Sequence, residues 1–213
     1  MIISPGRKYI FVHIPKTAGS SLALALEGRA MKDDIMMGDT PKAKKRRRRL
    51  KGVQASGRLW KHSRLCDIEG LLSAGDIRAY MTFTLVRNPW DRVVSYYHWL
   101  REQSFDHAAV ALAKQLEFGD FVLHPQTAQS LGATPFGSYM RFGSDEVPSL
   151  FIRIEDFAND AQPLFDHLGF DIELPRVNCS DRQARFQEYY SPQTRQAIAE
   201  ICQEDVARFG YEF

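Results

Sequence analysis

One short segment, residues 15–21, combines a lysine and three hydroxyl side chains with residues small enough to let the backbone approach an anion. The segment reads Pro15-Lys16-Thr17-Ala18-Gly19-Ser20-Ser21. Lys16 offers a full positive charge, and the helix predicted to follow adds about half a charge at its N-terminus. A turn that merely joined a strand to a helix would not need the lysine and the hydroxyls together. The segment therefore predicts a site for a phosphate or sulfate group.

The order of these residues differs from that of the Walker A loop of nucleoside triphosphatases. The Walker pattern G-x-x-x-x-G-K-[ST] places its lysine directly after the second glycine, whereas Lys16 precedes Gly19. We also identify no acidic magnesium ligand in the sequence. A P-loop-type nucleotide kinase or NTPase is therefore the alternative rather than the preferred interpretation.

Arg87 and Ser95 indicate a second anion site. Asn88 is a good N-cap and Pro89 suits the first helical position, so a helix is expected to begin directly after Arg87. A guanidinium offers a fixed fork of donors to a phosphate, and Ser95 lies away from the apolar stripe of that helix. Taken singly, Arg87 would be explained by an ion pair with Asp91, and Ser95 by an exposed position on the helix. Together with the 15–21 loop, they favour a second phosphate site.

Alternating strands and helices must position these side chains. Apolar runs at residues 9–14, 81–86 and 149–154 predict buried strands, the first two of them directly before the two anion motifs. A final helix is expected from Pro192 to the glycine at position 210. This order predicts an α/β fold with a mainly parallel sheet, and 213 residues suit one domain, 1–213.

The two motifs together resemble the PAPS-dependent sulfotransferase superfamily, in the branch of the Golgi carbohydrate sulfotransferases and their bacterial relatives. Shorter matches lie at residues 151–157 and 205–211. The resemblance implies a P-loop-like central parallel sheet flanked by helices. It also implies that residues 15–21 hold the 5′-phosphosulfate of 3′-phosphoadenosine-5′-phosphosulfate (PAPS), and that Arg87 and Ser95 hold its 3′-phosphate.

The same resemblance implies in-line transfer of a sulfonyl group to a hydroxyl or amine, with 3′,5′-ADP as the leaving group. Lys16 would stabilise the charge that develops on the oxygen bridging phosphate and sulfate. The family needs no metal, and we identify no cluster of acidic residues and histidines that predicts one. Carbohydrates, lipids and small molecules are all open as acceptors.

A general base works best with a pKa near the working pH, which favours histidine at about 6.5. His62 lies between the two motifs and directly follows a lysine, a context that resembles the acceptor-side base of related sequences. His62 is therefore the candidate base, and a surface histidine with no catalytic role is the alternative. His13 falls inside the first predicted strand and is expected to be a core histidine.

A basic run, residues 42–51, interrupts the connection between the two motifs. Seven of the 28 Lys and Arg residues lie within residues 42–49. Such a run favours an anionic or membrane-associated acceptor, and a solvated face or mobile loop is an equally open reading. A nucleic-acid-binding protein is a further alternative, but no aromatic residues interleave with the run and this partner is less favoured.

The three cysteines, Cys66, Cys179 and Cys202, are widely spaced and form no C-x-x-C pair. Three reduced thiols are expected rather than a zinc site or a disulfide framework. No apolar run approaches the ~20 residues of a membrane-spanning helix, and the first residues turn polar too soon for a signal peptide. A cytoplasmic protein is predicted.

Overall fold

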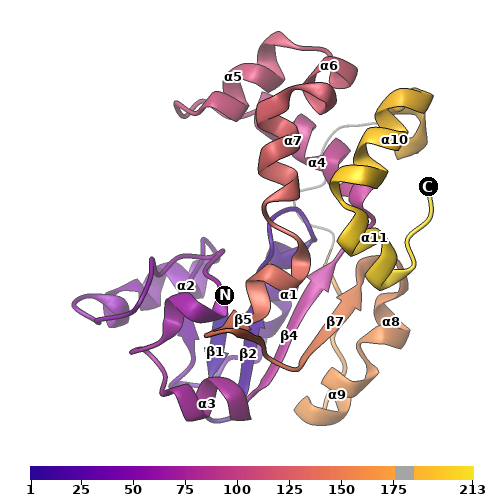
Figure 1. Cartoon of the computed structure of the whole chain (residues 1–213). Coiled ribbons are helices and arrows are strands. Elements are labelled where there is room, and N and C mark those ends of the chain that lie inside the picture. Colours follow the sequence, from indigo (N-terminus) through magenta and orange to yellow (C-terminus); the bar gives the residue numbers. More distant parts are fainter. Residues whose placement is uncertain (176–184) are drawn as a thin grey trace. The chain divides into compact units, whose positions relative to one another are not determined.

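The structure, a computed structural model, describes residues 1–175 and 185–213 (Figure 1). The chain divides into two compact units. Unit 1 comprises Met1–Val86 and Phe136–Asn178, and unit 2 comprises Arg87–Pro135 and Cys179–Phe213. The assignment of residues 1–213 to one domain stays a prediction.

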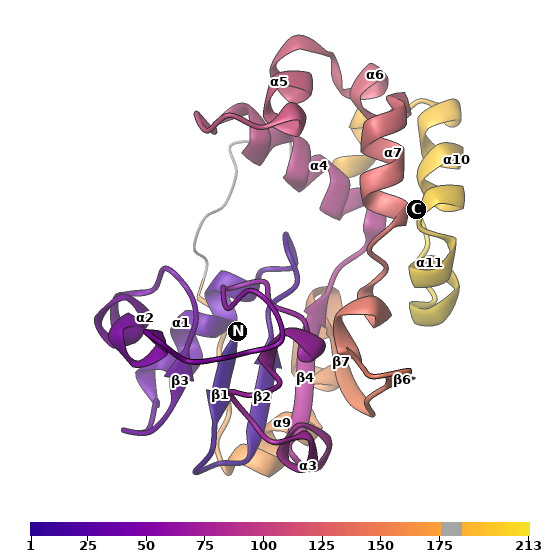
Figure 2. The same ribbon diagram turned by 60° about the vertical axis from the view of Figure 1, so that its left-hand side comes forward.

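Unit 1 is built on a five-stranded sheet of order β3-β1-β2-β4-β7 (Figure 2). Its strands are β1 (Ile2–Ser4), β2 (Tyr9–Val12), β3 (Ile35–Met36), β4 (Met81–Val86) and β7 (Ser149–Arg153). The central strands β2, β4 and β7 run parallel, whereas β1 runs antiparallel to both β2 and β3. The α/β fold and the three predicted strands are confirmed, and the antiparallel edge is an addition that the sequence analysis missed.

The register of the parallel strands brings their carboxyl ends to one edge of the sheet. Val12 pairs with Thr84, and Val86 pairs with Arg153. The Thr84 hydroxyl also donates to the Val12 carbonyl oxygen at 2.7 Å, which ties β4 to β2 where β2 ends. The loop at residues 15–21 therefore leaves the sheet at its carboxyl edge, where ligands of parallel α/β sheets bind.

The helices of unit 1 cover this sheet and enclose its core. They are α1 (Gly19–Gly28), α2 (Pro41–Arg46), α3 (Ala74–Ala79), α8 (Phe157–Asp160) and α9 (Gln162–Leu168), with 3₁₀ turns η1 (Arg47–Leu50), η2 (Leu65–Ile68), η3 (Phe136–Met140) and η4 (Ile154–Asp156). A small hairpin joins β5 (Arg141–Phe142) to β6 (Asp145–Glu146). Leu22 and Leu26 of α1 pack with Phe11 and Phe83 of the strands, so the helix that begins at the anion loop is anchored in the core.

Unit 2 is helical and its core is rich in aromatic residues. It contains α4 (Pro89–Arg101), α5 (Ala108–Gln115), α6 (Phe118–Leu123), α7 (Pro125–Gly132), η5 (Phe186–Tyr189), α10 (Pro192–Ile201) and α11 (Gln203–Phe209). The side-chain oxygen of Asn88 accepts from the Trp90 amide at 3.0 Å, which confirms the predicted start of α4. The single terminal helix expected from the sequence is instead two helices that meet at Cys202, and the second ends at Gly210 with φ 64°.

Cys66 is an exposed free thiol and Cys202 a buried one, and burial raises the pKa of Cys202 to about 11. Cys179, the third predicted thiol, lies outside the described residues. None of the helices in the described part of the chain is both long and apolar enough to span a membrane.

Candidate active site

The loop at residues 15–21 has a backbone suited to anion binding. Lys16 and Ala18 adopt positive φ angles of 66° and 60°, a region that non-glycine residues rarely occupy. Such conformations cost about 1–3 kcal/mol each and concentrate at functional sites. Ala18 is the N-cap of α1, and within the described residues no side chain caps this helix end. The amides of Gly19 and Ser20, the first two of α1, are therefore available as donors to an anion, whereas those of Ser21 and Leu22 donate to the Ala18 carbonyl oxygen.

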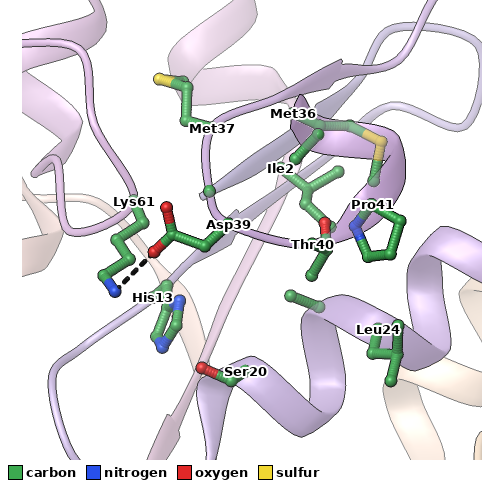
Figure 3. Close-up of a pocket in the computed structure, with 13 residues that line it drawn as sticks. Ile2, His13, Ser20, Leu24, Met36, Met37, Asp39, Thr40, Pro41 and Lys61 are labelled. Atoms are coloured by element: carbon green, nitrogen blue, oxygen red, sulfur yellow. Dashed lines mark hydrogen bonds and ion pairs between the residues drawn. The ribbon is translucent and has the colours of Figure 1, made fainter. Parts of the chain in front are cut away.

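The three loop hydroxyls occupy different environments. Thr17 is fully buried, and its hydroxyl donates to the Ile14 carbonyl oxygen at 2.9 Å. Thr17 therefore braces the loop and has its backbone amide, rather than its hydroxyl, to offer to a ligand. Ser21 is also buried, whereas Ser20 is half-buried and lines a cavity (Figure 3).

His13 packs directly against the start of α1. A Cβ atom added to Gly19 would lie 2.1 Å from His13 Cδ2, so only glycine fits at this position. The His13 ring also stacks on Phe11, with ring centroids 5.8 Å apart and planes at 17°. As predicted, His13 is a core histidine, and burial lowers its pKa well below the ordinary value.

His62 lies against His13, although 49 residues separate the two in sequence. Its Nδ1 atom is 2.8 Å from the His13 carbonyl oxygen. Because a carbonyl oxygen only accepts, Nδ1 must carry the proton and Nε2 must hold a lone pair. The ring also makes edge contacts with His13 and Trp60 at centroid distances of 4.6 and 5.0 Å. Burial lowers the pKa of His62 to about 4, so its neutral form dominates at neutral pH.

Three of the other histidines have structural roles. His107 caps α5 by accepting from the Ala109 amide at 3.1 Å, and His124 caps α7 in the same manner. The Nε2 atom of His167 lies 2.7 Å from the Arg7 carbonyl oxygen. Within unit 1, the imidazoles beside the anion loop are those of His13 and His62.

A cavity of about 210 Å³ opens beside the loop, within unit 1 (Figure 3). Ser20 and His13 form part of its wall, and Ile2, Leu24 and Met36 contribute apolar surface. A polar pair also lines it, in which Lys61 Nζ donates to Asp39 Oδ2 at 2.8 Å. Residues 36–41 and Lys61, which belong to the connection between the two anion motifs, thus help to form this cavity.

In unit 2, Arg87 forms the ion pair that the sequence analysis considered as the alternative to a ligand role. Its Nε and Nη2 atoms lie 2.7 and 2.6 Å from Asp91 Oδ2. Both side chains are largely buried, at 13% and 18% exposed, so the pair orients the guanidinium. Ser95, two turns further along α4, is buried at 6% exposed.

The basic run forms α2 and η1 and has two faces. On one face, Lys42 Nζ donates to the Glu27 carbonyl oxygen at 2.7 Å, and Arg46 Nη1 donates to the Asp34 carbonyl oxygen at 3.1 Å. The carboxylate of Glu27 accepts from the amides of Lys42 and Ala43, which caps α2. The exposed side chains of the run are those of Lys44, Lys45, Arg47, Arg48, Arg49 and Lys51. The run is therefore an anchored helix with a cationic outer face.

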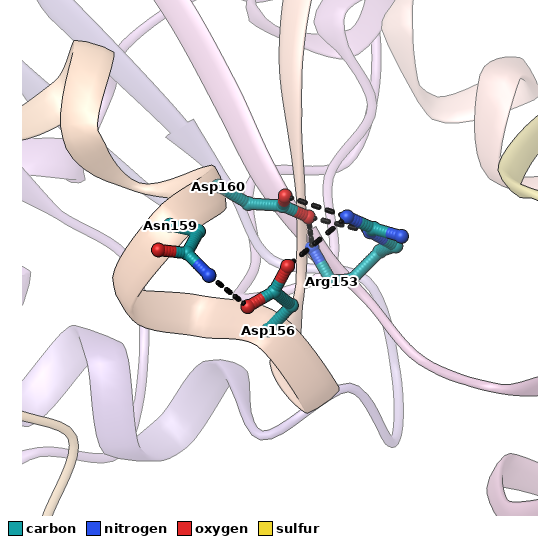
Figure 4. Close-up of polar contacts among 4 residues, drawn as sticks. All are labelled: Arg153, Asp156, Asn159 and Asp160. Carbon is teal, nitrogen blue, oxygen red and sulfur yellow. Dashed lines mark hydrogen bonds and ion pairs between the residues drawn. The ribbon is translucent and has the colours of Figure 1, made fainter.

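Arg153, at the carboxyl end of β7, contacts acidic residues at both ends of the short helix α8 (Figure 4). Its Nε and Nη2 atoms donate to the two oxygens of Asp160 at 2.7 and 2.8 Å, and Nη2 also reaches Asp156 at 3.3 Å. The hydrogen bonds from Arg153 lower the pKa of Asp160. Within the shorter match at residues 151–157, Arg153 thus braces the edge of the sheet. In the residues described, no group of three or more His, Cys, Asp or Glu side chains could hold a metal ion.

Comparisons with known proteins agree with this architecture. A family model described as "Sulfotransferase family" matches residues 1–212. Among solved structures, the chain is similar to the crystal structure of mouse sulfotransferase SULT7A1 complexed with PAP, with 16% identity and a TM-score of 0.50. That match covers 98% of this chain and 87% of the mouse chain, and at this identity it concerns the fold alone. A search of the curated proteins found no significant match.

Proposed function

The chain belongs to the sulfotransferase family, and on this premise we propose that it transfers the sulfonyl group of PAPS to a hydroxyl or amine of an acceptor. The observation that carries the proposal is the loop at residues 15–21, whose two residues with positive φ lead into an α1 N-terminus without a side-chain cap. An anion with several oxygens suits such a set of backbone donors.

PAPS has anionic groups at both ends, so it requires two sites. In this proposal, Lys16 and the amides of the loop bind the phosphosulfate, and Ser20 and Ser21 complete that site. Arg87 and Ser95 bind the 3′-phosphate. Asp91 Oδ2 lies 2.6 Å from Arg87 Nη2 and keeps the guanidinium oriented. This supports the proposal that Arg87 presents a fixed fork of donors to the phosphate.

The reaction is a displacement at sulfur. The acceptor oxygen or nitrogen forms a bond to sulfur while the bond from sulfur to the bridging oxygen breaks and 3′,5′-ADP leaves. Lys16 offsets the negative charge that develops on the bridging oxygen. Preorganised donors of this kind stabilise developing charge in the transition state.

His62 accepts the proton that the acceptor loses, at Nε2. Its hydrogen bond to the His13 carbonyl oxygen supports this role because it presents an unprotonated Nε2. A pKa of about 4 makes a weak base. A bound polyanionic donor nearby would favour the protonated form and raise that pKa toward the working range.

We propose an anionic acceptor, because the cationic face of α2 and η1 is anchored beside the cavity. A carbohydrate, a lipid or a small molecule could present such a charge, and an anionic membrane surface could present a lipid acceptor. A cytoplasmic location stays a prediction from the sequence.

Calorimetry with 3′,5′-ADP in the absence of magnesium tests the donor site. We expect micromolar binding to the wild-type protein. A hydrogen bond to a charged group contributes about 1.5–3 kcal/mol, so Lys16→Ala and Arg87→Ala should each weaken binding by about 10- to 100-fold. Lys114→Ala and Arg141→Ala, which change exposed cations elsewhere, serve as matched controls. If ATP with magnesium binds and 3′,5′-ADP does not, the proposal is wrong and a nucleotide kinase is favoured.

A further inference from the structure

The rim of the cavity carries more positive than negative charge. Asp39 at this rim contacts Lys61 Nζ at 2.8 Å and Arg47 Nη2 at 3.8 Å. The hydrogen bond from Lys61, with the charges of Arg47 and Lys44, lowers the pKa of the Asp39 carboxyl group. Two cations thus contact one carboxylate and the charge of Lys44 adds to theirs, so an anion arriving at the rim would meet an unbalanced positive charge.

The interior of the cavity is largely apolar. Ile2, Leu24 and Met36 line it, together with the ring of Pro41 (Figure 3). Methionine side chains adapt to irregular apolar ligands. The volume of about 210 Å³ is below the roughly 300–1,000 Å³ of pockets for drug-sized ligands. The cavity therefore suits one ring or a short aliphatic chain and is too small for an extended glycan.

The wall of the cavity also includes part of the donor loop. Ser20 is the second residue of α1, and His13 fills the space beside Gly19 at the start of the same helix. A ligand in the cavity can therefore place a hydroxyl group next to the loop that we propose to bind the phosphosulfate, while another part of it reaches the rim.

From these three features we propose that the cavity binds the acceptor, and that the acceptor is a small amphipathic anion. It would have a hydroxyl group for sulfonation, an apolar ring or chain in the cavity, and an anionic group beside Lys61, Arg47 and Lys44. This inference rests on the proposed function. In the reaction the hydroxyl oxygen bonds to sulfur, the bridging bond of PAPS breaks, and the hydroxyl proton passes to His62. The products are a sulfate ester and 3′,5′-ADP.

Two probes of similar shape test the charge preference. The first is 3-(4-hydroxyphenyl)propionate, and the second is 4-propylphenol, which has a methyl group in place of the carboxylate. With PAPS as donor, we expect kcat/KM to be about fivefold higher for the carboxylate, an effect on the scale of one partly exposed ion pair. The preference should shrink as ionic strength rises.

Two pairs of variants locate the binding site. Arg47→Gln should reduce the preference for the carboxylate, whereas Arg141→Gln, at an exposed arginine outside the basic run, should preserve it. Leu24→Phe fills part of the cavity and should lower kcat/KM for both probes about tenfold, because overpacking an apolar site is unfavourable. Leu123→Phe, at an exposed leucine of α6, is the control.

Binding of 3′,5′-ADP to each variant shows that it is folded and separates the two proposals. If 3′,5′-ADP binds but neither probe is sulfonated, the inference about the cavity is wrong and the proposed function stands. Equal kcat/KM for the two probes, or no effect of Leu24→Phe, would likewise overturn it. Sulfonation of a polysaccharide or of lipid vesicles without turnover of either probe would assign the acceptor to another class. If 3′,5′-ADP does not bind to the wild-type protein, the proposed function itself fails.

Discussion

The Nδ1 atom of His62 donates a hydrogen bond to the carbonyl oxygen of His13 at 2.8 Å, two residues before the anion loop. This bond fixes which nitrogen of His62 carries the proton. It also joins the connection between the two anion motifs to the carboxyl end of β2. A histidine held in this way is positioned rather than mobile, which is what a proton acceptor beside a reacting group requires.

Replacing His62 with asparagine separates its two roles. Asparagine can keep a donor to the His13 carbonyl oxygen but supplies no base, so kcat should fall by about 10²- to 10⁴-fold. The Kd for 3′,5′-ADP should stay within about twofold of the wild-type value, since the residues that we propose to bind this nucleotide are unchanged. His107→Asn is the control, because asparagine also caps helices well. An unchanged kcat in His62→Asn would remove His62 from the mechanism.

The buried histidines predict an acid-sensitive fold. The pKa of His62 is about 4 in the folded protein, against an ordinary value of 6.5, and that of His13 is also lowered by burial. Between pH 4 and 6.5 the unfolded chain therefore binds more protons than the folded protein does. The free energy of unfolding should fall as the pH drops from about 6.5 to 4. The loss from His62 alone is about 3 kcal/mol at most.

Urea unfolding at several pH values measures this loss, and His62→Asn should reduce it. The carboxyl groups of Asp39 and Asp160 have pKa values below their ordinary 3.8 and therefore titrate below this range. A free energy of unfolding that does not change between pH 6.5 and 4 would show that the two imidazoles are not buried in neutral form.

Gly19 cannot accept a side chain without moving His13. Gly19→Ala places a Cβ atom 2.1 Å from His13 Cδ2, so we expect a loss of about 1–3 kcal/mol in the free energy of unfolding and weaker binding of 3′,5′-ADP. Gly28→Ala, at the other end of α1, meets no atom within 4 Å and should be neutral or stabilising by up to about 1 kcal/mol. Equal effects of the two substitutions would contradict the close packing.

The carboxylate of Glu27 should anchor the basic helix. It is buried at 7% exposed and accepts from the Lys42 and Ala43 amides at 2.9 and 3.3 Å. Glu27→Gln should lower the free energy of unfolding by about 1–2 kcal/mol, as loss of an N-cap does. Trypsin should also cleave faster within the basic run. Glu117→Gln, at an exposed glutamate, is the control, and equal cleavage rates for the two variants would contradict the anchoring role.

Local features of the fold could be predicted from the sequence because they depend on neighbours in the chain. The strand at Met81–Val86 coincides with its apolar run, and the start of α4 follows from the pair Asn88 and Pro89. The strand at Ile2–Ser4 was missed, because three residues are too few to show a period, and it is defined by pairing with β2 and β3.

The sequence by itself determined the α/β order of elements, the family and the composition of the anion loop. All of these reside in short stretches whose chemistry does not depend on distant residues. Only the tertiary structure decided that His62 reaches the His13 carbonyl oxygen, 49 residues away in sequence. It also decided which members of the basic run are anchored, because Lys42, Arg46 and Arg49 find carbonyl oxygens 15, 12 and 17 residues away. A side chain's partner depends on which backbone groups the fold brings within hydrogen-bonding distance, and no local pattern encodes that.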